Sequence, residues 1–89
     1  MLNLEFQEST LEQIEGIFSF VAQDNPVSAV DVIQRIYHTI ENLRVFPYLG
    51  KTDSGILREI IEPRYKFRII YLVRDNTIYI VSIFKHQNY

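Results

Sequence analysis

Two helical patterns lie almost end to end in the first half of the chain, with only two or three residues between them. The first predicts a helix over about Thr10–Gln23, and the second predicts a helix of roughly eighteen residues that ends near Leu43. In the connection Asp24-Asn25-Pro26, Asn25 is a good helix cap and proline is tolerated at the first helical position. So short a connection forces an antiparallel hairpin, whose apolar stripes need a third element to cover them. The apolar positions are Leu11, Ile14, Phe18 and Val21, then Ala29, Ile33, Ile36, Ile40 and Leu43.

The second half of the chain carries strand patterns separated by short turns. A long loop at Phe46–Gly55 collects turn-forming residues and separates the two halves. Because the connections between the later strands are short, each is expected to be a hairpin turn, and the strands form an antiparallel meander. The expected strands are about Ile56–Glu62, Lys66–Val73 and Thr77–Phe84, with turns at Glu62-Pro63-Arg64 and Arg74-Asp75-Asn76.

The N-terminal residues predict one further strand. Leu2–Phe6 alternates apolar and polar side chains, as a short half-buried strand does, and it is expected to join an edge of the sheet. Ser9 and Glu12 then have the spacing of a capping box at the start of the first helix. The fold class expected for residues 1–89 is therefore a single α+β domain of order β-α-α-β-β-β. A helical hairpin packs on a twisted antiparallel sheet.

Composition excludes several classes of function. The chain has 89 residues and no cysteine, so disulfides, thiol nucleophiles and cysteine zinc sites are ruled out. No window is long and apolar enough to span a membrane, and the N-terminus lacks the pattern of a secretory signal. We therefore expect a cytoplasmic protein with no membrane partner and no cofactor or metal.

The net charge of −2 hides an asymmetry between the halves. Residues 1–45 hold seven acids and two bases, whereas residues 46–89 hold seven bases and four acids. Within the basic half, Arg64, Lys66 and Arg68 alternate in a segment that otherwise has a strand pattern. Side chains two apart in a strand share a face, so these cations are expected to line one side of the sheet and to meet anionic groups.

Six short segments occur in an order and at a spacing typical of one protein family. They are Leu11–Ile14, Asp24–Ala29, Leu43–Gly50, Leu57–Glu59, Tyr65–Tyr71 and Ile83–Asn88. The chain resembles the RelE/ParE superfamily of toxins from bacterial type II toxin–antitoxin modules, over nearly its whole length. Its Asn-Pro connector and Phe-Pro-x-Leu-Gly loop are more similar to the ParE branch.

The resemblance implies one of two activities. ParE-like toxins inhibit DNA gyrase and need no nuclease residues, whereas RelE-like toxins cleave mRNA on the ribosome. Both are neutralised by a cognate antitoxin protein. The acidity of the chain fits poorly with an enzyme that must lodge in ribosomal RNA, so gyrase is the first expectation and mRNA cleavage the second. An inactive relative that only binds a partner is the third.

The resemblance also implies roles for particular residues. Arg68 matches the arginine with which RelE-like nucleases hold the scissile phosphate, and Lys66 and His86 can supply charge and proton transfer if the chain is a nuclease. The alternative interpretation pairs Arg68 with Glu59 or Glu62 on the neighbouring strand, and treats His86 and Tyr89 as a solvated chain end. The residues expected to contact an acidic antitoxin or the target are Arg58, Arg64, Tyr65, Lys85 and Tyr89.

Overall fold

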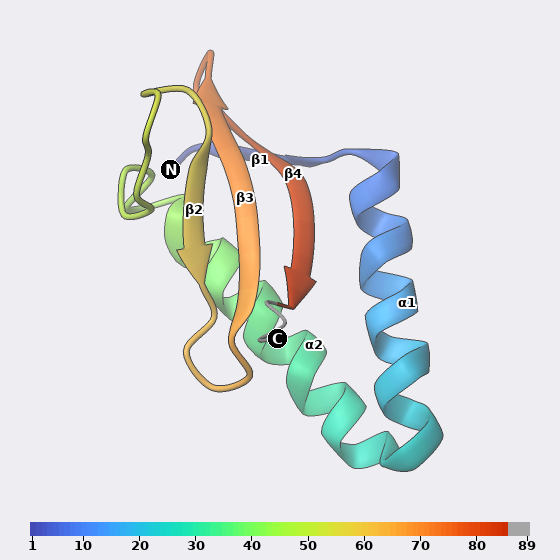
Figure 1. Cartoon of the computed structure of the whole chain (residues 1–89). Coiled ribbons are helices and arrows are strands. Elements are labelled where there is room, and N and C mark those ends of the chain that lie inside the picture. The colour runs from blue at the N-terminus through green and yellow to red at the C-terminus, as the bar shows by residue number, and fades with distance from the viewer. Residues whose placement is uncertain (86–89) are drawn as a thin grey trace.

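The computed structural model describes residues 1–85 and contains the helical hairpin that the sequence predicts. Helices α1 (Glu8–Asp24) and α2 (Pro26–Leu43) form a hairpin whose arms diverge from the connection at Asn25 (Figure 1). The Asn25 side chain accepts a hydrogen bond from the Ser28 amide at 3.1 Å, and Pro26 occupies the first helical position. The predicted cap is therefore confirmed, since it satisfies an amide that the helix leaves free.

The predicted capping box at the start of α1 is wrong. The helix begins at Glu8, its cap residue is Gln7, and no side chain bonds to the free amides there. Instead, the hydroxyl of the fully buried Thr10 donates to the Ile80 carbonyl at 2.9 Å. Gln13 reaches the same strand, where its amide oxygen accepts from the Ile83 N–H at 2.8 Å. The first two turns of α1 are thus fixed by the sheet rather than by a cap.

The strands form one four-stranded sheet of order β1-β4-β3-β2. Their bounds are Asn3–Phe6 for β1, Arg58–Ile61 for β2, Phe67–Arg74 for β3 and Thr77–Lys85 for β4. The three later strands are the predicted antiparallel meander, but β1 runs parallel to β4 at the sheet edge, so the sheet is mixed. The α+β class and the element order are confirmed.

The hairpin turn between β3 and β4 is confirmed, and its residue types explain its geometry. Asp75 and Asn76 form a two-residue turn, and both have positive φ, at 51° and 59°. Two-residue hairpin turns in which both residues have positive φ match the twist of the flanking strands, and Asp and Asn adopt positive φ at low cost.

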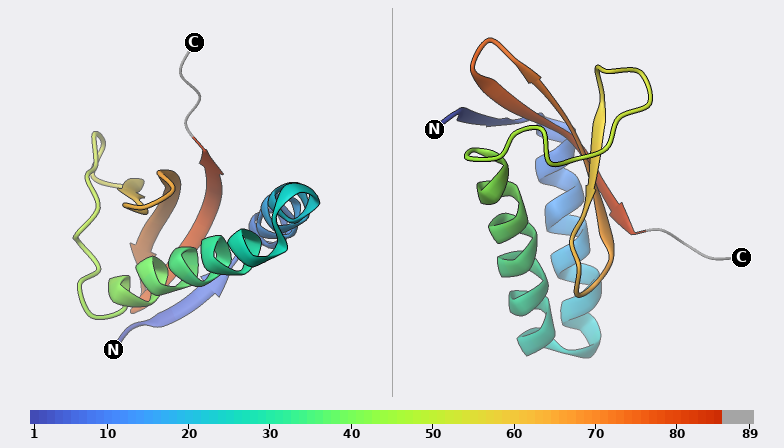
Figure 2. Two further views of the ribbon diagram at one scale, coloured as in Figure 1. Left: turned by 90° about the horizontal axis from the view of Figure 1, so that it is seen from below. Right: turned by 90° about the vertical axis from the view of Figure 1, so that its left-hand side faces the viewer.

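The core lies between α2 and one face of the sheet. Both helices cover this same face (Figure 2). Helix α2 supplies most of the fully buried helical side chains, while α1 adds only Ile14 to the apolar core. The buried apolar side chains are Ile14, Ala29, Val32, Ile36, Ile40, Leu43, Phe67, Ile69, Tyr71, Ile78, Ile80 and Ile83.

Tyr71 ties the long α2–β2 loop, residues 44–57, to this core. Its hydroxyl, on a fully buried ring, accepts from the Gly50 N–H and donates to the Pro47 carbonyl, both at 2.8 Å. A Cβ at position 50 would stand only 2.6 Å from that hydroxyl oxygen and 2.9 Å from the Glu59 carbonyl oxygen. Only glycine fits so close an approach, which explains the final residue of the Phe-Pro-x-Leu-Gly sequence.

We expect Tyr71→Phe to lower the free energy of unfolding by about 1–3 kcal/mol, because it leaves two loop groups without their partner. Denaturant unfolding of the variant and the wild type measures the difference. Tyr79→Phe is the control, since the Tyr79 hydroxyl makes no hydrogen bond to the part of the chain that the structure describes. Equal losses for the two variants would contradict the anchoring role of Tyr71.

Candidate functional site

Arg68 lies on β3 and is already paired. Its side chain is on the sheet face opposite the helices, where a guanidinium N–H group forms an ion pair and hydrogen bond with the Glu59 carboxylate of β2. The exposed fractions of the two side chains are 27% and 36%. The cross-strand pairing of Arg68 is thus present, with Glu59 rather than Glu62 as the partner. The Arg68 Nε atom is buried and makes no hydrogen bond within residues 1–85.

Arg64 and Lys66 do not share a strand face with Arg68. Strand β3 starts only at Phe67, and Lys66 has a φ of 65°, which no strand residue adopts. The prediction of three aligned cations is therefore wrong. The cations are not aligned because a turn precedes β3. In this turn the buried Glu62 carboxylate accepts hydrogen bonds from the amides of Arg64 and Tyr65, each at 2.7 Å. This carboxylate satisfies the turn backbone from inside the fold.

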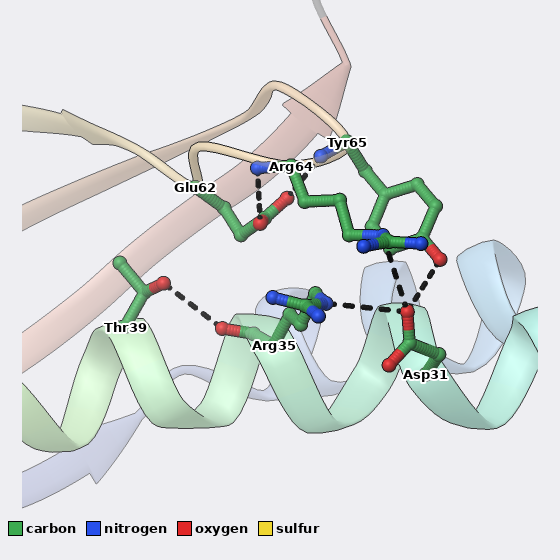
Figure 3. Close-up of polar contacts among 6 residues, drawn as sticks. All are labelled: Asp31, Arg35, Thr39, Glu62, Arg64 and Tyr65. Atoms are coloured by element: carbon green, nitrogen blue, oxygen red, sulfur yellow. Dashed lines mark hydrogen bonds and ion pairs between the residues drawn. The ribbon is translucent and has the colours of Figure 1, made fainter.

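Asp31 on α2 gathers the side chains of this turn (Figure 3). One of its carboxylate oxygens accepts from the Tyr65 hydroxyl at 2.5 Å and from Arg35 Nε at 3.2 Å. Arg64 Nε lies 3.6 Å from the same oxygen. The cluster fastens the β2–β3 turn to the middle of α2. Of the predicted contact residues, Arg64 and Tyr65 are thus brought together, but by an acid of the chain itself.

The pKa of Asp31 is lowered from its usual value, and the hydrogen bond from Tyr65 is the largest cause. Arg35 and Arg64 lower the pKa of Asp31 further, while the loss of hydration opposes them. Each of these contacts favours the charged carboxylate over the protonated one.

An apolar groove of about 820 Å³ runs between α1, the end of β4 and Tyr65. Phe20 and Phe84 line it with exposed fractions of 72% and 43%. Gly16 also faces it, and a Cβ there would meet no atom within 4 Å. Lys85 lies at the groove with its ammonium 5.8 Å from the centre of the Phe67 ring. The groove therefore has an apolar floor and at least one cation.

The outer edge of β4 is open beside this groove. Strand β1 pairs with β4 only as far as Ile80, and within the described part of the chain no strand pairs with the outer edge of Val81–Lys85. Gln13 covers one amide there, that of Ile83. An extended peptide can add to an edge of this kind by main-chain hydrogen bonds.

The remaining predicted site residues lie apart from one another. Arg58 sits on β2 at the far edge of the sheet, where its guanidinium lies 4.9 Å from the centre of the Tyr48 ring and donates to the Gly50 carbonyl at 2.9 Å. Lys85 is at the α1 groove. His86 and Tyr89 fall outside the described residues. The structure thus brings Tyr65 and Lys85 to one groove and leaves Arg58 at another surface.

Sequence reasoning missed two of these features. The groove residues Gly16 and Phe20 were not predicted, although Gly16 in a helical pattern and Phe20 off the apolar stripe were the available signals. The Asp31 cluster was missed because its contact with Tyr65 joins residues 34 apart in the sequence, and only its Asp31–Arg35 pair has local spacing.

Residues 1–85 contain no group of three or more histidines and carboxylates placed to hold a metal ion. Neither helix of the described chain has the length and apolarity to cross a membrane.

Comparison with known protein families decides the family. Residues 4–88 match the family model described as the ParE toxin of the type II toxin–antitoxin system parDE. The chain belongs to the ParE toxin family. It is a toxin of the RelE/ParE type, as its sequence segments suggested. A comparison with curated proteins gave no match.

Solved structures share the ParE fold seen here. The chain is similar to a chain of the chromosomal ParDE toxin–antitoxin system from P. aeruginosa, with a TM-score of 0.82 and 20% identity over 98% of both chains. It is also similar to a chain of the intact E. coli RelBE toxin–antitoxin complex, with a TM-score of 0.75 and 16% identity over 99% of this chain and all of that one. At these identities the likeness shows the fold, and it spans both branches of the superfamily.

We expect Asp31→Asn to lower the stability of this ParE-family toxin in a pH-dependent way. Folding lowers the Asp31 pKa, so the charged carboxylate stabilises the folded state. This stabilisation is complete at pH values above the pKa of Asp31 in the unfolded chain, about 3.9. It is lost as the pH falls through the lower pKa of Asp31 in the folded state. The stability difference between wild type and variant, measured by denaturant unfolding from pH 7 to pH 3, should therefore shrink below about pH 4.

Asp53→Asn, in the exposed α2–β2 loop, is the matched control. A difference for Asp31→Asn that stays constant down to pH 3 would show that the carboxylate is not held in its charged form by Tyr65 and the arginines.

Proposed function

We propose that this toxin arrests bacterial growth by inhibiting DNA gyrase, and that a cognate antitoxin neutralises it. Membership of the ParE family supports the proposal, and so does the state of Arg68. The Arg68–Glu59 ion pair is the main reason to favour gyrase over RNA as the target. It occupies the cation that a RelE-like nuclease would need.

Cleavage of RNA without a metal requires a free cation at the scissile phosphate, together with a base and an acid. Here the Arg68 guanidinium faces a carboxylate in its own sheet. A phosphate that approached Arg68 would also approach Glu59, and two like charges about 4 Å apart repel by about 4 kcal/mol at an effective dielectric of 20, before screening by salt. Glu59 must therefore be displaced or protonated before Arg68 can hold a phosphate.

The other candidate nuclease groups give Arg68 little support. Lys66 lies in the turn, with a backbone conformation that takes it off the strand. Lys85 pairs across the sheet with Phe67, next to Arg68, but its ammonium lies 5.8 Å from the centre of the buried Phe67 ring, on the opposite sheet face from Arg68. A protein that acts by binding another protein needs no such cluster, which is the reason to favour gyrase over mRNA on the ribosome.

The antitoxin is proposed to bind at the groove between α1 and β4. Helix α1 buries only Thr10 and Ile14 among its seventeen residues, and it leaves Phe20 largely exposed. The groove offers an apolar floor, the open edge of Val81–Lys85 and the Lys85 cation. An antitoxin segment with apolar side chains, an extended backbone and an acidic residue complements all three features.

We expect Arg68→Ala to retain growth arrest on expression in bacteria, and to inhibit supercoiling by purified gyrase within about threefold of the wild type. The pair that it removes is partly exposed and is worth at most about 1 kcal/mol, so the fold persists. If the chain were instead a nuclease, removal of the phosphate clamp would lower transcript cleavage in a translating extract by about a hundredfold or more.

Glu59→Gln is the matched control, because it releases Arg68 without removing the cation. Under the proposal it changes neither growth arrest nor gyrase inhibition. Transcript cleavage that disappears in Arg68→Ala and rises in Glu59→Gln would contradict the gyrase proposal and assign the RelE-like activity. A wild-type chain that leaves growth unaffected, with or without its antitoxin, would indicate an inactive binding relative.

A further inference from the structure

The α2–β2 loop displays an unusual amount of apolar surface. Six large apolar side chains of this loop have exposed fractions between 46% and 67%. Surface hydrophobic residues scattered singly are ordinary, but six in one short loop are a concentration of the kind that marks an interaction site. We call this group the loop patch, and its members are Val45, Phe46, Tyr48, Leu49, Ile56 and Leu57.

The backbone that carries the loop patch is held in place. The Tyr71 hydroxyl binds both Pro47 and Gly50, which flank Tyr48 and Leu49. Lys51 then exchanges two backbone hydrogen bonds with Glu59 of β2, at 2.8 and 2.9 Å. With the backbone fixed on both sides, Tyr48 and Leu49 stay outside the core. Such a surface loses little conformational freedom on binding, which favours affinity.

The charges around the loop patch indicate what it can bind. Arg58 stacks on Tyr48, and Lys51 is exposed beside Leu49, while Asp53 is the acid of the loop. Two cations beside so much apolar surface are too few for a nucleic acid, whose binding depends on many phosphate contacts. An apolar protein segment that carries a carboxylate fits better, because the cations complement the acid and the patch covers the apolar groups.

The loop patch lies at the opposite edge of the sheet from the α1–β4 groove. In Figure 1 the loop stands beside β2, whereas α1 stands beyond β4. Strands β3 and β4 therefore separate the two surfaces. One short peptide segment cannot cover both the groove and the loop patch. Each surface therefore binds a separate partner segment, or a separate part of one long segment.

We propose that the loop patch is the surface through which the toxin binds its target protein, by an apolar target segment that carries at least one carboxylate. This inference rests on the proposed function, because it names the surface that the growth-arresting toxin uses. It adds that the target surface is separate from the antitoxin groove. Tyr48 and Leu49 are its central residues, and Lys51 and Arg58 attract the acid of the target.

The double variant Tyr48→Ser with Leu49→Ser tests the inference. Both side chains point out of the fold, so the melting temperature should stay close to that of the wild type. We expect the concentration that inhibits purified gyrase to rise by at least about tenfold, as for loss of a binding hot spot. Growth arrest on expression should weaken in parallel, while binding to the purified antitoxin, measured by calorimetry, stays within about threefold.

The matched control is Val27→Ser with Val30→Ser on α2. These side chains have exposed fractions of 80% and 48% and line neither surface. Serine and valine also have similar helix propensities. The control should inhibit gyrase and bind the antitoxin as the wild type does.

Other results of these experiments would each point to a different alternative. A loop-patch variant as active as the wild type overturns the inference alone, whereas a wild-type chain that does not arrest growth overturns the proposed function and this inference together. Loss of antitoxin binding with growth arrest retained assigns the loop patch to the antitoxin. Full activity in the double variant but not in Lys51→Gln indicates a polyanion as the occupant. A change from dimer to monomer in the double variant shows that a second copy covers the patch.

Discussion

The Tyr71 hydroxyl is the contact on which the surface of this toxin most depends. It is fully buried on β3, yet it fixes Pro47 and Gly50 in a loop that has little regular structure of its own. Burial raises the pKa of this hydroxyl, so it stays protonated and can donate and accept at once. The core thereby sets the position of the exposed Tyr48 and Leu49, and the packing of the sheet is linked directly to the surface that we assign to the target.

The ionisable groups of the sheet face and the turn are largely engaged by the protein itself. Glu59 pairs with Arg68, Asp31 holds Arg64 and Tyr65, and the Glu62 carboxylate closes the turn. These contacts stabilise the arrangement of β2, β3 and α2, and they engage Arg64 and Arg68 with carboxylates of the protein itself. This fits a protein that works through binding surfaces better than it fits a nuclease.

The sequence predicted elements well where the signal was local. Helical spacing and the Asn25-Pro26 connection predicted the hairpin, and Asp75-Asn76 predicted a turn, because these depend on neighbouring residues. The sequence-based predictions failed mainly where contacts between residues far apart in the chain determine the structure. Thr10, for example, bonds to Ile80, 70 residues away, in place of a capping box. The turn at Lys66 was missed although it is local, because no sequence pattern showed that the Glu62 carboxylate would bind the turn amides. The groove and the loop patch arise only when α1, β4 and β2 come together.

The central claim is that antitoxin and target bind at opposite edges of one sheet. Amide hydrogen exchange of the toxin, alone and in each complex, tests it most directly. The account predicts that the antitoxin slows exchange in α1 and in Val81–Lys85 while residues 45–57 change little. Purified gyrase should slow exchange in residues 45–57 and leave Val81–Lys85 unchanged. Protection of the same residues in both complexes, or no protection of residues 45–57 by gyrase, would contradict the account.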